Sequence, residues 1–333
     1  MKGLIIFDMD GVLVDVSASY RETVRRTASL FLSGAVSFER LPDPLFSLKD
    51  LAAVKQSGGL NNDWDLSRTV CSLLFSKLSV PHVSQAPDPW LRYAQTIAHC
   101  DAAPLARFLA AHAMPLTALF ARAAHRGSAF VDGLYTGDVG SGNVIKQIFQ
   151  EIYLGGRIFE KTYGFPPRMT AGEGLYRRES LIIAKDALQR LGGKYLLAIA
   201  TGRPAAEAAL PLRHHGLEGL FRRVCTLDDC LVAEAAFRAD TGRGVSLSKP
   251  SPFMLDRIVE ELGAAGLDVF YVGDMPDDMA AATASAFGVT AVGFLASSPD
   301  PQRLRTDLER AGAHCVVASP EALEAFFLAD AAT

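Results

Sequence analysis

The sequence lacks several features that would assign it to a specialised class of protein. Its five cysteines are odd in number and form no CxxC pair, which favours reduced, buried thiols over a disulfide framework or a zinc site. No apolar stretch is long enough to span a membrane, and the N-terminal apolar run is too short for a signal sequence. The net charge is −4 and the basic residues are scattered, so no nucleic-acid surface is indicated. We therefore expect a soluble cytoplasmic protein with no nucleic-acid or membrane partner, of open oligomeric state.

The 333 residues do contain a series of short apolar runs, each ending in glycine or polar residues. Such runs are typical of strands that are buried on both faces of a parallel sheet. Helical patterns lie between the late runs, at residues 179–191, 252–262 and 276–286. This alternation predicts an α/β fold with a doubly wound, Rossmann-like parallel sheet. The expected strands are residues 3–8, 195–200, 269–272, 289–294 and 315–318.

The segment from residue 16 to residue 174 shows no such alternation and has the pattern of amphipathic helices, at residues 21–31, 66–78, 105–124 and 144–153. We therefore expect two domains. Residues 1–15 and 175–333 form the α/β core, and residues 16–174 form a mostly helical insertion. Three polar, glycine-containing segments of the insertion, residues 58–65, 137–143 and 172–177, are candidate substrate loops. Turns with helix caps at Asp65 and Asn143 are the favoured explanation.

Reactive side chains follow the expected strands of the core. Because strand ends in such a sheet converge on one crevice, we expect these side chains to meet. Carboxylates that face one another repel unless a cation lies between them, and oxygen ligands suit Mg²⁺. A carboxylate can also attack phosphorus, and the transferred group then needs a metal, a lysine and hydroxyl or amide donors. The residues concerned are Asp8, Asp10, Thr201, Gly202, Arg203, Lys249, Asp274 and Asp278.

Four runs in the core resemble, in order, the motifs of the haloacid dehalogenase superfamily. They read FDMDGVLVD, ATGRP, SKPSP and VGDMPDDMAAA, and they extend from Phe7 to Ala282. The resemblance implies a hydrolase close to subfamily IA, in which the helical insertion would be an enlarged C1 cap. It also implies a Mg²⁺-dependent phosphatase that acts on a small phosphorylated metabolite through an aspartyl-phosphate.

The resemblance further implies a catalytic role for each matching residue. Asp8 would be the nucleophile, and Asp10 would protonate the leaving oxygen and later activate water. Thr201 and the backbone amide of Gly202 would hold the phosphoryl oxygens. Lys249 would bridge the phosphate and the Asp8 carboxylate.

The implied metal site uses overlapping residues. Mg²⁺ would bind the Asp8 carboxylate, the Asp10 main-chain carbonyl and Asp274, while Asp278 would hold metal-bound waters or the lysine. Arg203, next to the phosphate-binding residues, would contact the substrate or else form a surface ion pair.

Asp10 narrows the reaction. The halide of a haloalkane leaves without a proton, whereas the alkoxide of a phosphate ester needs one, so an acid at this place favours phosphate chemistry over dehalogenation. The resemblance also implies that a family member that cleaves phosphonates would lack this acid. Two alternatives stay open. One is a phosphomutase of the sugar-phosphate type that uses the same residues, and the other is a non-catalytic binding protein of the same fold.

Overall fold

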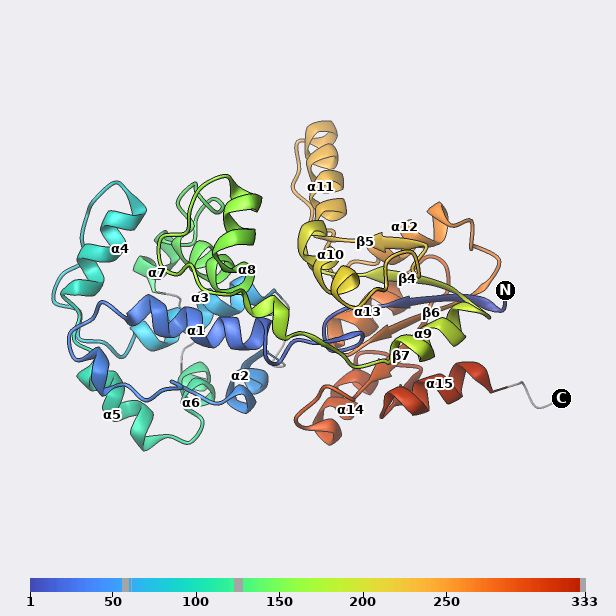
Figure 1. The fold of residues 1–333 in the computed structure, drawn as a ribbon, viewed down its shortest axis with the longest axis horizontal. Coiled ribbons are helices and arrows are strands. Elements are labelled where there is room, and N and C mark those ends of the chain that lie inside the picture. The colour runs from blue at the N-terminus through green and yellow to red at the C-terminus, as the bar shows by residue number, and fades with distance from the viewer. Residues whose placement is uncertain (56–59, 61, 123–127, 330–333) are drawn as a thin grey trace. The chain divides into compact units, whose positions relative to one another are not determined.

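The computed structural model describes residues 1–55, 60, 62–122 and 128–329, which form two compact units (Figure 1). The first unit consists of Met1–Val16 and Glu179–Thr333, and the second of Ser17–Arg178. The chain thus leaves the first unit soon after its first strand and returns to it at Glu179. Residues 58, 59 and 61 of the expected loop 58–65 lie outside the described residues.

A six-stranded sheet lies at the centre of the first unit, with its strands in the order β5-β4-β1-β6-β7-β8. All neighbouring strands are parallel, which confirms the predicted α/β fold. One strand of this sheet, the short β5, was not predicted from the sequence. The strands are β1 (Gly3–Phe7), β4 (Leu196–Ala200), β5 (Arg223–Cys225), β6 (Asp268–Gly273), β7 (Thr290–Phe294) and β8 (Cys315–Val317).

Helices cover both faces of this sheet because successive side chains of a strand point to opposite faces. Leu4 and Ile6 of β1 belong to a buried cluster with apolar residues of α12, α13 and α14. On the other face, α9 packs on β4 and α15 packs on α9, and Phe327 of α15 meets the ring of Phe270 edge to face. The helices are α9 (Lys185–Gly192), α10 (Ala205–His214), α11 (Leu227–Thr241), α12 (Phe253–Glu261), α13 (Pro276–Ala284), α14 (Pro301–Arg310) and α15 (Pro320–Leu328).

The segment expected to be helical over residues 179–191 is a helix only from Lys185 onward. Before it, β3 (Ser180–Leu181) pairs antiparallel with β2 (Val14–Asp15), and Ile182 N donates to Leu13 O. The helical pattern was wrong for these first residues because long-range strand pairing satisfies their backbone groups instead. The two segments that lead out of and back into the first unit are therefore tied together.

Within the described residues of the second unit, the elements are helical, joined by loops and isolated bridges. The single helix expected over residues 105–124 is wrong, since α5 ends at Ala111 and α6 begins at Pro115. His112, directly after α5, is extended. Pro115 disfavours helical geometry in the residue that precedes it, so the helix does not continue into α6. The elements are α1 (Tyr20–Leu32), η1 (Phe38–Arg40), α2 (Leu48–Lys55), α3 (Asp63–Phe75), α4 (Pro89–Ala98), α5 (Ala103–Ala111), α6 (Pro115–Arg122), α7 (Ala129–Gly133), α8 (Val144–Tyr163) and η2 (Leu175–Arg178).

Of the two helix caps predicted in the second unit, one is confirmed and the other is wrong. The Asn143 side chain accepts from Lys146 N at 2.9 Å and starts α8, which confirms the expected cap. Asp65 is not a cap. Asn62 starts α3 instead by accepting from Trp64 N, and Asp65 lies in the first turn. An extended asparagine three residues earlier had already supplied the cap.

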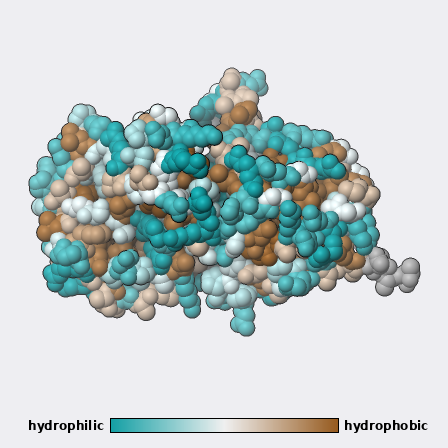
Figure 2. Space-filling model, viewed as in Figure 1, coloured by the Kyte–Doolittle hydropathy of each residue, from teal (hydrophilic) through white to brown (hydrophobic). Residues whose placement is uncertain are grey.

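Apolar and polar side chains are interspersed on the face drawn in Figure 2, and α11 exposes Leu231, Val232 and Phe237.

All five cysteines are free, as their number suggested. Among the described residues no single helix has the length and apolar character of a membrane span. Helices α5 and α6 meet that test only as a pair bent by 105°.

Candidate active site

The central strands of the first unit carry the expected reactive residues at their carboxyl ends. Asp8 follows β1, Thr201 follows β4 and Asp274 follows β6. The backbone ladder continues into these residues, since Asp8 N donates to Val272 O at 2.8 Å and Thr201 N donates to Cys225 O at 3.0 Å. Their positions are therefore fixed by the sheet rather than by a loop.

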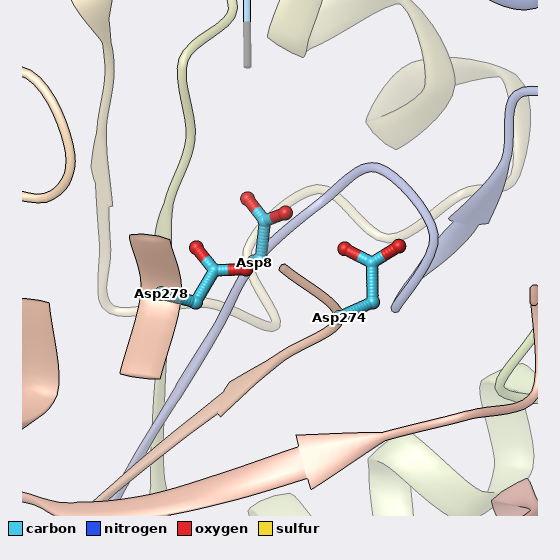
Figure 3. A group of neighbouring side chains, drawn as sticks. All are labelled: Asp8, Asp274 and Asp278. Atoms are coloured by element: carbon cyan, nitrogen blue, oxygen red, sulfur yellow. The ribbon is translucent and has the colours of Figure 1, made fainter. Parts of the chain in front are cut away.

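Three buried carboxylates gather at this edge. Asp8, Asp274 and Asp278 bring oxygen atoms within 4.8 Å of one another. Figure 3 shows the Asp8 carboxylate between those of Asp278 and Asp274. Like charges this close favour protonation unless a cation intervenes. A set of carboxylate oxygens of this kind fits a hard divalent cation such as Mg²⁺.

The electrostatics of Asp8 agree with that fit. Burial raises its pKa from 3.8 to about 8, and the charges of Asp278, Asp274 and Asp10 act in the same direction. Lys249 acts in the opposite direction, toward the ionised form. One lysine therefore does not balance the negative charge around the expected nucleophile, and a further cation next to Asp8 would favour its carboxylate.

Lys249 is buried between two of the carboxylates. Its Nζ lies 2.7 Å from Asp8 Oδ1 and 2.8 Å from Asp278 Oδ1. Burial alone would lower the pKa of Lys249, but the charges of Asp278 and Asp8 hold that pKa well above its usual value. Asp278 is itself fixed, because Oδ1 accepts from the Tyr271 hydroxyl at 2.9 Å and Oδ2 accepts from Met275 N at 3.0 Å. Both of its oxygens thus accept from donors, and one of these donors is the lysine.

Asp274 lies against the turn that follows the first strand. Gly11 in this turn has φ +80°, and a Cβ at that position would lie 2.1 Å from Asp274 Oδ2. Ser297, beyond β7, donates its hydroxyl to the same oxygen at 3.3 Å. Only glycine permits both this backbone conformation and this close approach. The residue after Asp10 therefore controls the space around Asp274.

The residues after β4 offer donors to the site. The buried Thr201 hydroxyl accepts from Arg203 N at 3.2 Å, so its own proton is directed elsewhere. Gly202 is exposed, and no atom lies within 4 Å of the place where a Cβ would be. A hydroxyl and an open backbone at one strand end are suitable donors for a phosphoryl oxygen.

The Arg203 guanidinium is held by two carboxylates. Its Nε donates to Asp10 Oδ1 at 2.7 Å, and its two terminal nitrogens donate to the Glu179 carboxylate at 3.0 and 3.1 Å. The side chains of Arg203 and Glu179 are each only 1% exposed. The arginine therefore joins Asp10 to the returning segment rather than forming a surface ion pair.

Three residues with contacts at the site were not identified from the sequence: Glu179, Tyr271 and Ser297. Glu179 had been included in a helical pattern, and Ser297 lies in a loop with no motif. Tyr271 had one weak signal, a hydroxyl inside an otherwise apolar strand that needs a partner when buried.

In the second unit, the candidate substrate loop 137–143 borders a pocket of about 460 Å³. Its Gly140, Ser141 and Gly142 line this pocket with Trp90, Arg168 and several neighbours. The Arg168 guanidinium lies 5.2 Å from the centre of the Trp90 ring. This loop therefore forms a turn and also lines part of the pocket.

One family model matches part of the chain. Residues 179–285 match the family model described as haloacid dehalogenase-like hydrolase. This part of the chain is similar to that family. The resemblance predicted from the sequence is therefore confirmed, with a match over residues 179–285.

Solved structures share the fold. A Northeast Structural Genomics Consortium target is 23% identical with a TM-score of 0.62, over 98% of this chain and 97% of its own. A phosphatase from Thermococcus thioreducens is 20% identical with a TM-score of 0.52, over 92% and 99%. A haloacid dehalogenase-like protein of unknown function from Agrobacterium tumefaciens is 17% identical with a TM-score of 0.51, over 98% and 97%.

One curated relative has a different kind of name. A Phytophthora nicotianae protein named imidazoleglycerol-phosphate dehydratase is 26% identical over 322 residues, which are 94% of this chain and 49% of that protein. The chain therefore spans about half the length of this relative.

Proposed function

We propose that this hydrolase is a Mg²⁺-dependent phosphatase that removes phosphate from a small phosphorylated metabolite through an aspartyl-phosphate on Asp8. The observation that carries the proposal is the contact of Asp8 Oδ1 with Lys249 Nζ at 2.7 Å, beside the carboxylate of Asp274. A carboxylate paired with a lysine can accept a phosphoryl group whose negative charge the same lysine stabilises.

The proposed reaction has two displacements. In the first, an Asp8 oxygen attacks phosphorus, the ester P–O bond breaks, and the leaving oxygen takes a proton from Asp10. Thr201 Oγ1 and the Gly202 amide donate to the phosphoryl oxygens while Lys249 neutralises part of their charge. In the second, Asp10 removes a proton from water, which attacks phosphorus and releases inorganic phosphate and the Asp8 carboxylate.

Mg²⁺ would be held by the carboxylates of Asp8 and Asp274 and by the main-chain carbonyl of Asp10. When bound, it supplies positive charge that favours ionised Asp8 and stabilises the phosphoryl oxygens. Asp278, whose oxygens accept from Lys249, Tyr271 and Met275, serves this site by orienting the lysine.

The second unit is proposed to be an enlarged C1 cap that excludes water and selects the substrate. Its insertion directly after the first strand supports this assignment, because its two connections to the first unit leave and return beside Asp10.

A panel of phosphorylated metabolites tests the proposal. Purified protein with Mg²⁺ should release inorganic phosphate from at least one ester, and Asp8→Asn should abolish this release. Wild-type protein that stays inactive over the whole panel, with or without the substitution, would favour a non-catalytic binding protein. Isomerisation of a sugar phosphate without phosphate release would favour a phosphomutase instead.

The curated relative adds one compound to the panel, since its name refers to imidazoleglycerol phosphate. This compound is an alkyl phosphate ester, so the site described above could hydrolyse it. Phosphate release from it would support a phosphatase for an imidazole-bearing ester. Loss of water with the phosphate retained would overturn the phosphatase proposal for this substrate and favour the relative's named activity.

A further inference from the structure

Asp10, Arg203 and Glu179 are linked by successive ion pairs beside the expected nucleophile, and Arg203 and Glu179 are buried. Both Nε and Nη2 of Arg203 contact Asp10 Oδ1, at 2.7 and 2.6 Å. Among the described residues no hydrogen bond or ion pair to Asp10 Oδ2 is seen, and the Asp10 side chain is 26% exposed. One oxygen of the expected proton donor is thus anchored while the other is accessible.

Glu179 fixes the arginine that anchors Asp10. Its two oxygens accept from Nη1 and Nη2 of Arg203 at 3.0 and 3.1 Å, which is the paired geometry that matches a planar guanidinium to a carboxylate. This pairing fixes the plane of the guanidinium. Because the guanidinium is rigid, fixing its plane also fixes the direction of Nε toward Asp10.

The backbone of Glu179 is also held on both sides. The next residues form β3, which pairs with β2 a few positions after Asp10. The main-chain carbonyl of Glu179 accepts from His215 Nε2 at 3.2 Å. The carboxylate is therefore presented to Arg203 from a fixed segment, the one by which the chain returns to the first unit.

Stability alone is a poor explanation for this arrangement. A buried ion pair gains little net stability, because the loss of hydration of both charges offsets their attraction. An Asp carboxylate at a partly exposed strand end, however, rotates about two bonds unless something holds it. A fixed arginine restricts that rotation, and placement of a catalytic group within a narrow range of positions has a large effect on rate.

We propose that Glu179 is a positioning residue that acts through Arg203 to direct Asp10 Oδ2 at the leaving oxygen of the substrate. Arg203 then contacts Asp10 rather than the substrate phosphate, which differs from the role that the sequence suggested. The inference rests on the proposed phosphatase function, in which Asp10 is the general acid and base.

The test compares two leaving groups. Departure of p-nitrophenolate needs little protonation, whereas departure of an alkoxide depends on it. The value of kcat/KM covers the steps up to departure of the leaving group, so it isolates the first proton transfer. The probes are p-nitrophenyl phosphate and glycerol 3-phosphate. If another alkyl monophosphate of the panel is hydrolysed faster than glycerol 3-phosphate, that ester takes its place.

Glu179→Gln should lower kcat/KM for the alkyl ester about 10- to 100-fold, the range expected when the support of a catalytic group is removed, and for the aryl ester less than about 5-fold. Arg203→Lys should have the same selective effect, because lysine cannot bridge two carboxylates in one plane. Glu179→Asp should recover part of the alkyl activity.

The matched control is Glu324→Gln, which breaks the Arg190–Glu324 ion pair elsewhere on the first unit and should leave both values within about 2-fold. Assays are run well below the lowest melting temperature of the set. Equal losses for both esters in Glu179→Gln would assign the residue a merely structural role, and no loss would also overturn the inference. Wild-type protein that hydrolyses neither ester would instead overturn the proposed function itself.

Discussion

Replacing Asp278 by asparagine tests how Lys249 is held, independently of any substrate. Asp278 is fully buried and receives three donors, from Lys249, Tyr271 and Met275. Asparagine has the same shape but offers one acceptor oxygen and one donor NH₂ group. Either orientation of the amide places its NH₂ against at least one of these donors. The substitution therefore removes a charge and creates a donor–donor conflict without creating a cavity.

The magnitude follows from these contacts. Removing one partner of a buried ion pair costs about 3–5 kcal/mol, because the other charge stays buried. Here the Asp8 carboxylate, 2.7 Å from Lys249, remains as a partner, and its repulsion with Asp278 disappears. We therefore expect the low end, about 3 kcal/mol less free energy of unfolding. For a unit of this size that is a decrease of about 6–12 °C in melting temperature.

The assay is thermal unfolding by circular dichroism in buffer with EDTA, so that metal binding does not alter the comparison. Asp277→Asn is the matched control. It is the same substitution one residue earlier on α13, at a half-buried aspartate for which the described residues show no hydrogen bond or ion pair. We expect it to change stability by no more than about 0.5 kcal/mol. A melting temperature of Asp278→Asn within 2 °C of wild type, or equal to that of the control, would refute the reasoning.

Three further predictions concern the same site. Tyr271→Phe removes only the hydroxyl that donates to Asp278, so it should cost about 1.5–3 kcal/mol in the same unfolding assay, and an unchanged melting temperature would mean that this hydrogen bond is not formed. Gly11→Ala should reduce phosphate release about 100-fold or more, because the added Cβ would clash with Asp274. The control Gly263→Ala also has a positive φ, of +60°, but no atom lies near the added Cβ, so it should lose stability only. Equal activities of the two variants would contradict the proposed crowding. Treatment with EDTA should abolish phosphate release and added Mg²⁺ should restore it, and a full rate in EDTA would show that the reaction needs no divalent cation.

Much of the fold could be predicted because it depends on local patterns. Apolar runs of strand length, with helical patterns between them, specify a parallel sheet whatever the details of packing. The strand ends then determine where Asp8, Thr201 and Asp274 lie, since carboxyl ends of parallel strands share one edge. One error occurred where a local pattern competed with a distant partner. The segment at Ser180–Leu181 pairs with β2 instead of continuing a helix.

The sequence by itself therefore determined the α/β core and the residue types that lie at its strand ends. Only the tertiary structure decided which atoms face one another. Arg203 is two residues from Thr201, yet it contacts Asp10, 193 positions away, and Glu179, 24 positions away. No local pattern encodes such a choice, because a long flexible side chain takes its direction from the charges that surround it after folding. Asp8 and Asp10 were recognisable as a pair from the outset, whereas the distinct supports of each, Lys249 for one and Arg203 with Glu179 for the other, exist only in the folded chain.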